Sequence, residues 1–102
     1  MSALEKVYVK VYMKDRQKLV AVCDSDLIGK TFREGKLKLE VTSKFYGGEL
    51  VTASEALKQL LDADMGNLVG RNAVKMAVDS KLVDPDAIIY IAGIPHVQLL
   101  KL

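Results

Sequence analysis

One thiol and one imidazole carry the most reactive chemistry in this sequence. Cys23 precedes Asp24 at the end of an apolar run, and His96 follows the turn Gly93-Ile94-Pro95. A thiol and an imidazole that meet in the fold can form a nucleophilic pair. Because the residues before Cys23 are apolar and no basic residue adjoins it, we expect Cys23 to be buried and unreactive. A single histidine disfavours a transition-metal site, which needs several His or Cys ligands, and we predict no cofactor.

The segment Gly66–Arg71 could bind an anion. If a helix begins at Asn67, its free backbone amides and Arg71, one turn in, would attract a phosphate or carboxylate. The segment lacks the second glycine-rich turn of a nucleotide-binding loop. We therefore favour the alternative, in which Asn67 caps the helix and Gly70 allows close packing.

Polar residues in the other loops extend this candidate ligand site. Phe45-Tyr46-Gly47-Gly48-Glu49 could expose Tyr46 to a ligand, or could simply turn the chain with Phe45 in the core. Loops and element ends are where binding groups concentrate. We therefore predict that these loops surround one cleft, as in a small enzyme or ligand-binding protein, and we assign no catalytic residue. The ligand-binding candidates are Asp24, Lys30, Arg33, Tyr46, Glu49, Asn67, Arg71 and His96.

The composition is that of one folded domain. Half of the 102 residues are hydrophobic, 27% are charged, and there are two prolines and seven glycines, which excludes disordered and collagen-like chains. A lone cysteine cannot form an internal disulfide, which favours a reducing compartment. No apolar run approaches the length that spans a bilayer. We expect a cytoplasmic protein with a single domain over residues 1–102 and no membrane contact, and we predict no particular oligomeric state.

Hydrophobic periodicity predicts the elements that position these residues. Alternation indicates strands at 7–14, 19–23 and 37–41, with a structured loop at 24–35. Thr52 and Glu55 form a capping box for a helix that runs to about Met65. A second helix is expected from Asn67 to about Lys81, followed by strands at 88–91 and 96–101. The predicted fold class is α+β, a single mixed or mostly antiparallel sheet with two helices packed on one face, in the order β-β-β-α-α-β-β.

The basic charge belongs to the strand-rich half of the chain. The formal charge of +2 argues for no partner by itself, but ten of the fifteen Lys and Arg residues lie between positions 6 and 44. Alternation sends lysines and tyrosines of the first strand to the face opposite its valines. If the strand at 37–41 shares that sheet, its lysines join the same face. The predicted RNA-contacting residues are Tyr8, Lys10, Tyr12, Lys14, Lys36 and Lys38.

Several stretches resemble an uncharacterised archaeal protein family, domain of unknown function 424. The similarity covers nearly the whole chain and rests on Val22–Asp24, Leu27–Gly35, Phe45–Glu49, Asn67–Gly70 and Gly93–Gln98. The family has no assigned activity to carry over. The resemblance implies an archaeal protein linked to translation, since such proteins are associated with ribosome and initiation-factor genes. RNA or a ribosome-associated protein is therefore the expected partner, and an interaction-only scaffold is a third alternative.

Overall fold

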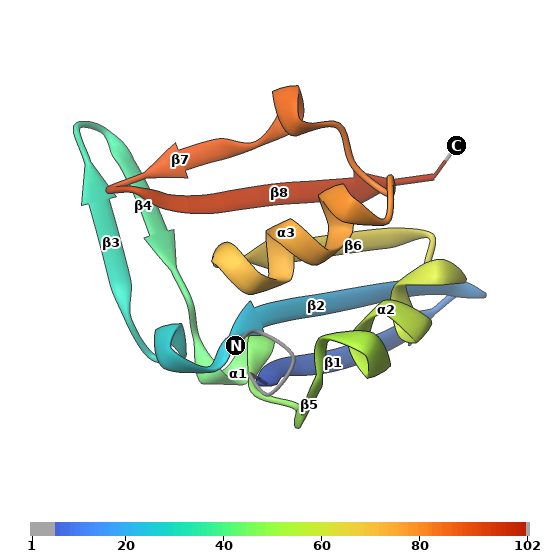
Figure 1. The fold of residues 1–102 in the computed structure, drawn as a ribbon. Coiled ribbons are helices and arrows are strands. Elements are labelled where there is room, and N and C mark those ends of the chain that lie inside the picture. Colours follow the sequence, from blue (N-terminus) through green and yellow to red (C-terminus); the bar gives the residue numbers. More distant parts are fainter. Residues whose placement is uncertain (1–5, 102) are drawn as a thin grey trace.

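A six-stranded sheet forms the centre of the computed structural model, which describes residues 6–101 (Figure 1). Its strand order is β5-β1-β2-β6-β8-β7. The only parallel pair in this sheet is β2 with β6, and the other neighbours are antiparallel. The strands are β1 (Lys6–Lys14), β2 (Gln17–Asp24), β5 (Glu49–Thr52), β6 (Met65–Val69), β7 (Ile89–Ile91) and β8 (Ile94–Leu100).

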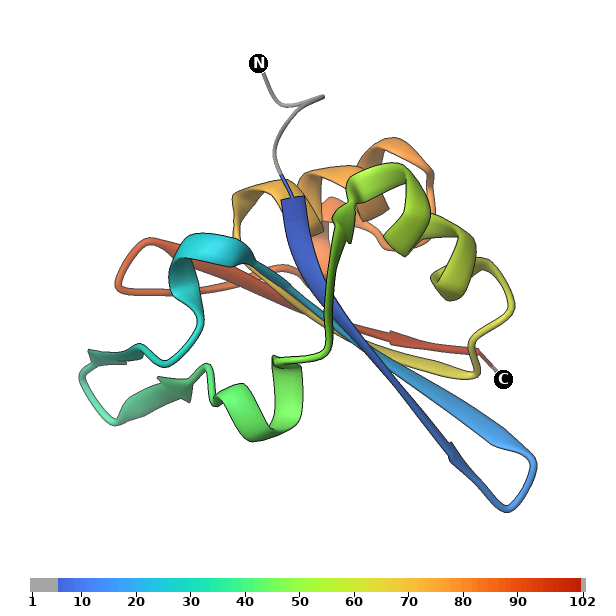
Figure 2. The same cartoon turned by 90° about the horizontal axis from the view of Figure 1, so that it is seen from below.

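Different elements cover the two faces of the sheet (Figure 2). Helices α2 (Ala53–Leu61) and α3 (Arg71–Asp79) lie on the first face. The second face carries the short helix α1 (Ser43–Tyr46) and a separate hairpin of β3 (Thr31–Glu34) and β4 (Leu37–Glu40). Single 3₁₀ turns occur at Ser25–Leu27 and Pro85–Ala87. No helix within residues 6–101 is long and apolar enough to cross a membrane.

Strand alternation divides the core into two layers. The first layer lies between the sheet and helices α2 and α3, where Val7, Val20 and Leu68 are fully buried. The second lies under α1 and the β3–β4 hairpin and includes Cys23, Tyr46 and Val69. Burial of apolar surface on both faces explains why β2 is apolar on both sides.

The carboxylate of Asp24 joins the end of β2 to the start of α3. It is 5% exposed and accepts hydrogen bonds from the amides of Asn72 (3.0 Å) and Ala73 (2.9 Å). Gly70 precedes the helix at φ +108°, and a Cβ there would lie 2.4 Å from the Asp24 carboxyl carbon. Helix α3 therefore receives its N-terminal cap from a distant residue, and only glycine fits beside that residue.

The α+β class, the mixed sheet and the Thr52–Glu55 capping box are confirmed. Several boundaries are wrong. The first long helix ends at Leu61 rather than near Met65, and Asn67 lies inside β6 instead of capping a helix. Met65, Val69 and Ala73 recur every four residues, which is the spacing of one face of a helix. The short buried strand β6 followed by α3 therefore has the sequence pattern of a single helix.

The strand predicted at 37–41 is present as β4, but it does not belong to the main sheet. It lies in the separate two-stranded sheet, paired with β3 inside the segment predicted as a loop. The strand β5 and the helix α1 were not predicted, so the order β-β-β-α-α-β-β and the single sheet are corrected. The last hairpin turns at Ala92 and Gly93, both at positive φ, one residue earlier than expected.

Replacing Asp24 with alanine should lower the free energy of unfolding by about 2 kcal/mol, because two charge-assisted hydrogen bonds to buried amides are lost. Urea denaturation measures this change. Asp26→Ala is the matched control, since Asp26 is exposed, and should change stability by less than about 0.5 kcal/mol. Equal effects of the two substitutions would contradict the capping role.

Candidate functional site

Strand register defines three rows of side chains that cross the second face. One row runs from Tyr8 through Cys23 and Val69 to His96 and Ile89. The middle row is Lys10, Ala21, Asn67 and Gln98, and the last is Tyr12, Leu19, Met65 and Leu100. Residues that are paired directly across neighbouring strands project to the same side of the sheet.

Helix α1 and the β3–β4 hairpin cover only part of this face (Figure 2). Cys23 and Val69 in the first row are fully buried, whereas Leu100 is 64% exposed and Gln98 is exposed. We call the uncovered part the open face and define it as Leu19, Met65, Asn67, His96, Gln98 and Leu100. Unlike the helix-covered first face, it is accessible to a partner.

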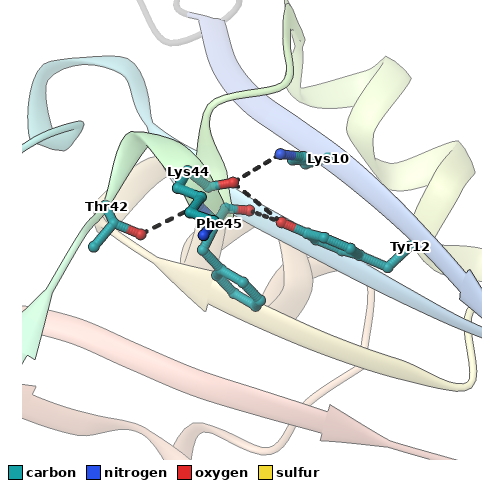
Figure 3. Close-up of a pocket in the computed structure, with 5 residues that line it drawn as sticks. All are labelled: Lys10, Tyr12, Thr42, Lys44 and Phe45. Atoms are coloured by element: carbon teal, nitrogen blue, oxygen red, sulfur yellow. Dashed lines mark hydrogen bonds between the residues drawn. The ribbon is translucent and has the colours of Figure 1, made fainter.

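A hollow of about 310 Å³ borders the open face, between β1 and α1 (Figure 3). Its lining is basic and aromatic. The Tyr12 and Phe45 rings are stacked, with centroids 5.4 Å apart and an interplanar angle of 18°. Lys10 Nζ lies 5.4 Å from the centroid of the Tyr12 ring. The lining residues are Lys10, Tyr12, Thr42, Lys44 and Phe45.

Hydrogen bonds fix α1 against β1. Tyr12 Oη donates to the carbonyl oxygen of Phe45 at 2.7 Å, and Lys10 Nζ donates to that of Lys44, also at 2.7 Å (Figure 3). Thr42 caps the helix by accepting from the Phe45 amide. Gly48 then passes directly over β1, since a Cβ there would lie 2.1 Å from the Val9 carbonyl oxygen. These contacts give the basic–aromatic hollow a fixed shape.

Two polar side chains of the open face are hydrogen-bonded to each other. His96 Nε2 and Asn67 Oδ1 are 3.0 Å apart. Burial lowers the pKa of His96 below its ordinary value of 6.5, so the imidazole is neutral at pH 7. Gln98 lies directly opposite Asn67.

The predicted RNA-contacting residues divide into two places. Lys10, Tyr12 and Lys14 lie on β1 with their side chains on the second face, and Tyr8 is half-buried against the second core layer. Lys36 and Lys38 do not join them, because their hairpin is outside the main sheet. Lys38 also pairs with Glu40, with 3.6 Å between Nζ and Oε2.

The predicted ligand-binding residues do not surround one cleft. Asp24 lies on the helix-covered side, where its carboxylate fills the N-terminus of α3, the position at which an external anion would bind. Tyr46 is 5% exposed, within the second core layer. Asn67 and His96 are together on the open face, and the other candidates are elsewhere: Lys30 and Arg33 in or beside β3, Glu49 on β5, and Arg71 at the start of α3.

Cys23 and His96 do not form a nucleophilic pair. Val69 stands between them in the cross-strand row, which separates their Cα atoms by two strand spacings, about 10 Å. Burial, followed by the charges of Asp24 and Asp26, raises the pKa of the Cys23 thiol from 9.0 to about 12. The thiol is therefore protonated at neutral pH, as expected of a structural cysteine. Among the described residues, no cluster of three or more His, Cys, Asp or Glu side chains could hold a metal ion.

Comparison with known proteins agrees with the resemblance seen in the sequence. A family model described as a protein of unknown function (DUF424) matches residues 12–102. The chain belongs to this family. It is also similar to the crystal structure of an uncharacterized conserved protein from Methanopyrus kandleri, an archaeon, with 26% sequence identity, a TM-score of 0.79 and 95% of each chain covered. No curated protein matches the chain.

Several residues of this candidate site were not predicted: Thr42 and Lys44 in the hollow, and Leu19, Met65, Gln98 and Leu100 on the open face. Phe45 was expected either in the core or beside an exposed Tyr46. The adjacency of Lys44 and Phe45 in the sequence was the available signal. It could not be used without knowing that α1 crosses β1, a contact between residues more than thirty positions apart.

Tyr12→Phe should lower the free energy of unfolding by about 1 kcal/mol, since it removes the hydrogen bond to the Phe45 carbonyl and keeps the stacked ring. Urea denaturation provides the value. Tyr90→Phe should have no effect, because Tyr90 is 57% exposed. A Tyr12→Phe protein as stable as the wild type would show that this bond does not hold α1 in place.

Alkaline pH should destabilise the protein. Burial also raises the pKa of Tyr46, from 10.0 to about 12, with the Cys23 charge as the second cause. The Cys23 thiol and the Tyr46 hydroxyl both hold their protons more tightly in the folded protein than in the unfolded chain. Their contribution to the free energy of unfolding is therefore complete below about pH 9 and is lost as pH rises toward 12.

Urea denaturation between pH 8 and 11 measures this loss of stability, and the free energy of unfolding of Cys23→Ala should decline less steeply with pH.

The native Cys23 thiol should also resist Ellman's reagent at pH 7.5 and react on unfolding. Rapid labelling of the native protein, or stability independent of pH over this range, would overturn the assignment of Cys23 as a buried neutral thiol.

Proposed function

We propose that this protein binds single-stranded RNA at the basic–aromatic hollow and the adjoining open face. One observation carries the proposal: lysines from two separate segments, β1 and α1, meet at a stacked aromatic pair beside an uncovered sheet face. Ammonium groups neutralise phosphates, and exposed ring surfaces stack on unpaired bases. Sheets that present aromatic residues to single-stranded RNA are a recurrent solution to this task.

The lysines of the hollow are available to an anionic partner. The ion pairs within residues 6–101 are Lys18–Asp62, Lys38–Glu40 and Lys75–Asp79, and none involves Lys10, Lys14 or Lys44. Lys10 donates to a carbonyl oxygen, which leaves its positive charge uncompensated. Lys14 lies two residues beyond Tyr12 and lines a second hollow of about 460 Å³, together with Asp15.

An enzyme built around Asp24, Tyr46, Asn67 and His96 is less well supported. The Asp24 carboxylate is bound to backbone amides, and the Tyr46 ring is buried. RNA binding requires neither the Asp24 carboxylate nor the Tyr46 hydroxyl. The proposal retains Lys10, Tyr12 and Lys14 from the sequence-based prediction and adds Lys44 and Phe45. It leaves out the half-buried Tyr8, and Lys36 and Lys38. A translation-linked role would make ribosomal RNA the natural target.

The direct test is a fluorescence-anisotropy titration with single-stranded RNA at 50 and 200 mM salt. Binding should weaken with salt, because phosphate contacts release counterions. Lys14→Glu with Lys44→Glu should weaken binding at least about tenfold, since two favourable phosphate contacts become repulsive.

The matched control is Lys58→Glu with Lys75→Glu. These exposed lysines lie on α2 and α3, over the opposite face, and the net charge changes by the same amount. Affinity should fall much less than with the Lys14 and Lys44 pair. Absence of binding at 50 mM salt, or an equal loss in the two double variants, would refute the proposed site.

A further inference from the structure

Uncharged polar groups gather on one part of the open face, across strands β6 and β8. Asn67 and Gln98 lie directly opposite each other, and His96 lies two residues before Gln98 on the same side of β8. The residues that these two strands present to the helices are instead apolar, including Leu68, Val97 and Leu99. The amide and imidazole groups therefore lie on the open face, where they can bond to one another or to a partner.

The hydrogen bond between Asn67 and His96 fixes part of this arrangement. When the neutral imidazole donates from Nε2 to Asn67 Oδ1, the amide nitrogen of Asn67 keeps its two donors and the imidazole Nδ1 keeps its lone pair. Gln98 is exposed, and within residues 6–101 no hydrogen bond engages its side chain. Both amides can thus offer a donor to an incoming ligand.

A hollow of about 370 Å³ adjoins this group. His96 and Gln98 supply its polar lining, while Ala87, Ile89 and Val97 supply the apolar part, and Ile89 is 54% exposed. Pockets that recognise flat ring systems combine an apolar surface with a few placed hydrogen-bonding groups. The hollow has both components.

The register connects this hollow to the lysines. Lys10, Ala21, Asn67 and Gln98 form one cross-strand row, so Lys10 and Gln98 are three strand spacings apart, about 14 Å. A single strand of RNA lying across β1, β2, β6 and β8 would have its phosphates near the lysines and a neighbouring base at Gln98.

We propose that Asn67, His96 and Gln98 form a base-recognition subsite with a preference for adenine. Side-chain amides pair with adenine in a bidentate manner, donating to N7 and accepting from the N6 amino group. Gln98 is the residue free to do so, with Ile89 beside it as an apolar contact for the ring. This inference rests on the proposed function, because it requires RNA on the open face.

Octameric oligo(A), oligo(U) and oligo(C) are the probes, titrated at 50 mM salt. The wild-type protein should bind oligo(A) more tightly by about tenfold, the discrimination expected of one bidentate amide contact. Gln98→Ala should reduce that preference to less than about threefold and leave the salt dependence unchanged, because the phosphate contacts remain. Gln59→Ala is the matched control, since Gln59 is an exposed glutamine on α2, and it should keep the preference.

The possible outcomes separate this inference from the proposal on which it rests. RNA binding with no adenine preference, or with a preference that survives Gln98→Ala, overturns the subsite and leaves RNA binding intact. No binding of any octamer by the wild-type protein removes both. Loss of the preference in Gln98→Ala, with thermal unfolding unchanged, supports the subsite.

Discussion

The contact between the Asp24 carboxylate and the start of α3 organises the helix-covered side of this protein. The carboxylate is buried and satisfies two amides that the helix leaves unpaired. It ties the end of β2 to the segment that leaves β6, which stabilises the one parallel pair of the sheet. It also excludes every residue but glycine at position 70 and occupies the helix terminus that an external anion would otherwise use.

Because α2 and α3 cover the first face, the second face is the side of the sheet that offers uncovered residues to a partner. Helix α1 and the β3–β4 hairpin bury the region around Cys23 and Val69 but leave the open face accessible (Figure 2). Tyr12 belongs to both regions, since its hydroxyl holds α1 and its ring lines the hollow. Under the proposed function, structural and binding roles therefore meet in the same side chain.

Local patterns in the sequence were sufficient for some features. Alternation identified β1 and the face that carries Lys10 and Tyr12, and the Thr52–Glu55 spacing identified the start of α2. Contacts between residues far apart in the sequence could not be predicted from these local patterns. Asp24 was predicted to bind a ligand because an aspartate at the end of a strand is common in ligand sites. Its sequence context is the same when the partner is a backbone amide, here that of Ala73, forty-nine residues away.

The most direct test of a single recognition face is to map backbone amide chemical shifts by NMR during titration with single-stranded RNA. The shifts should move for residues of β1, α1, β6 and β8 whose side chains lie on the second face, with Tyr12, Phe45 and Gln98 among them. Amides of α2 and α3, including those of Asn72 and Ala73 that bind Asp24, should stay unchanged. Shifts concentrated on α2 and α3, with β1 and α1 unaffected, would contradict the open face as the site of function.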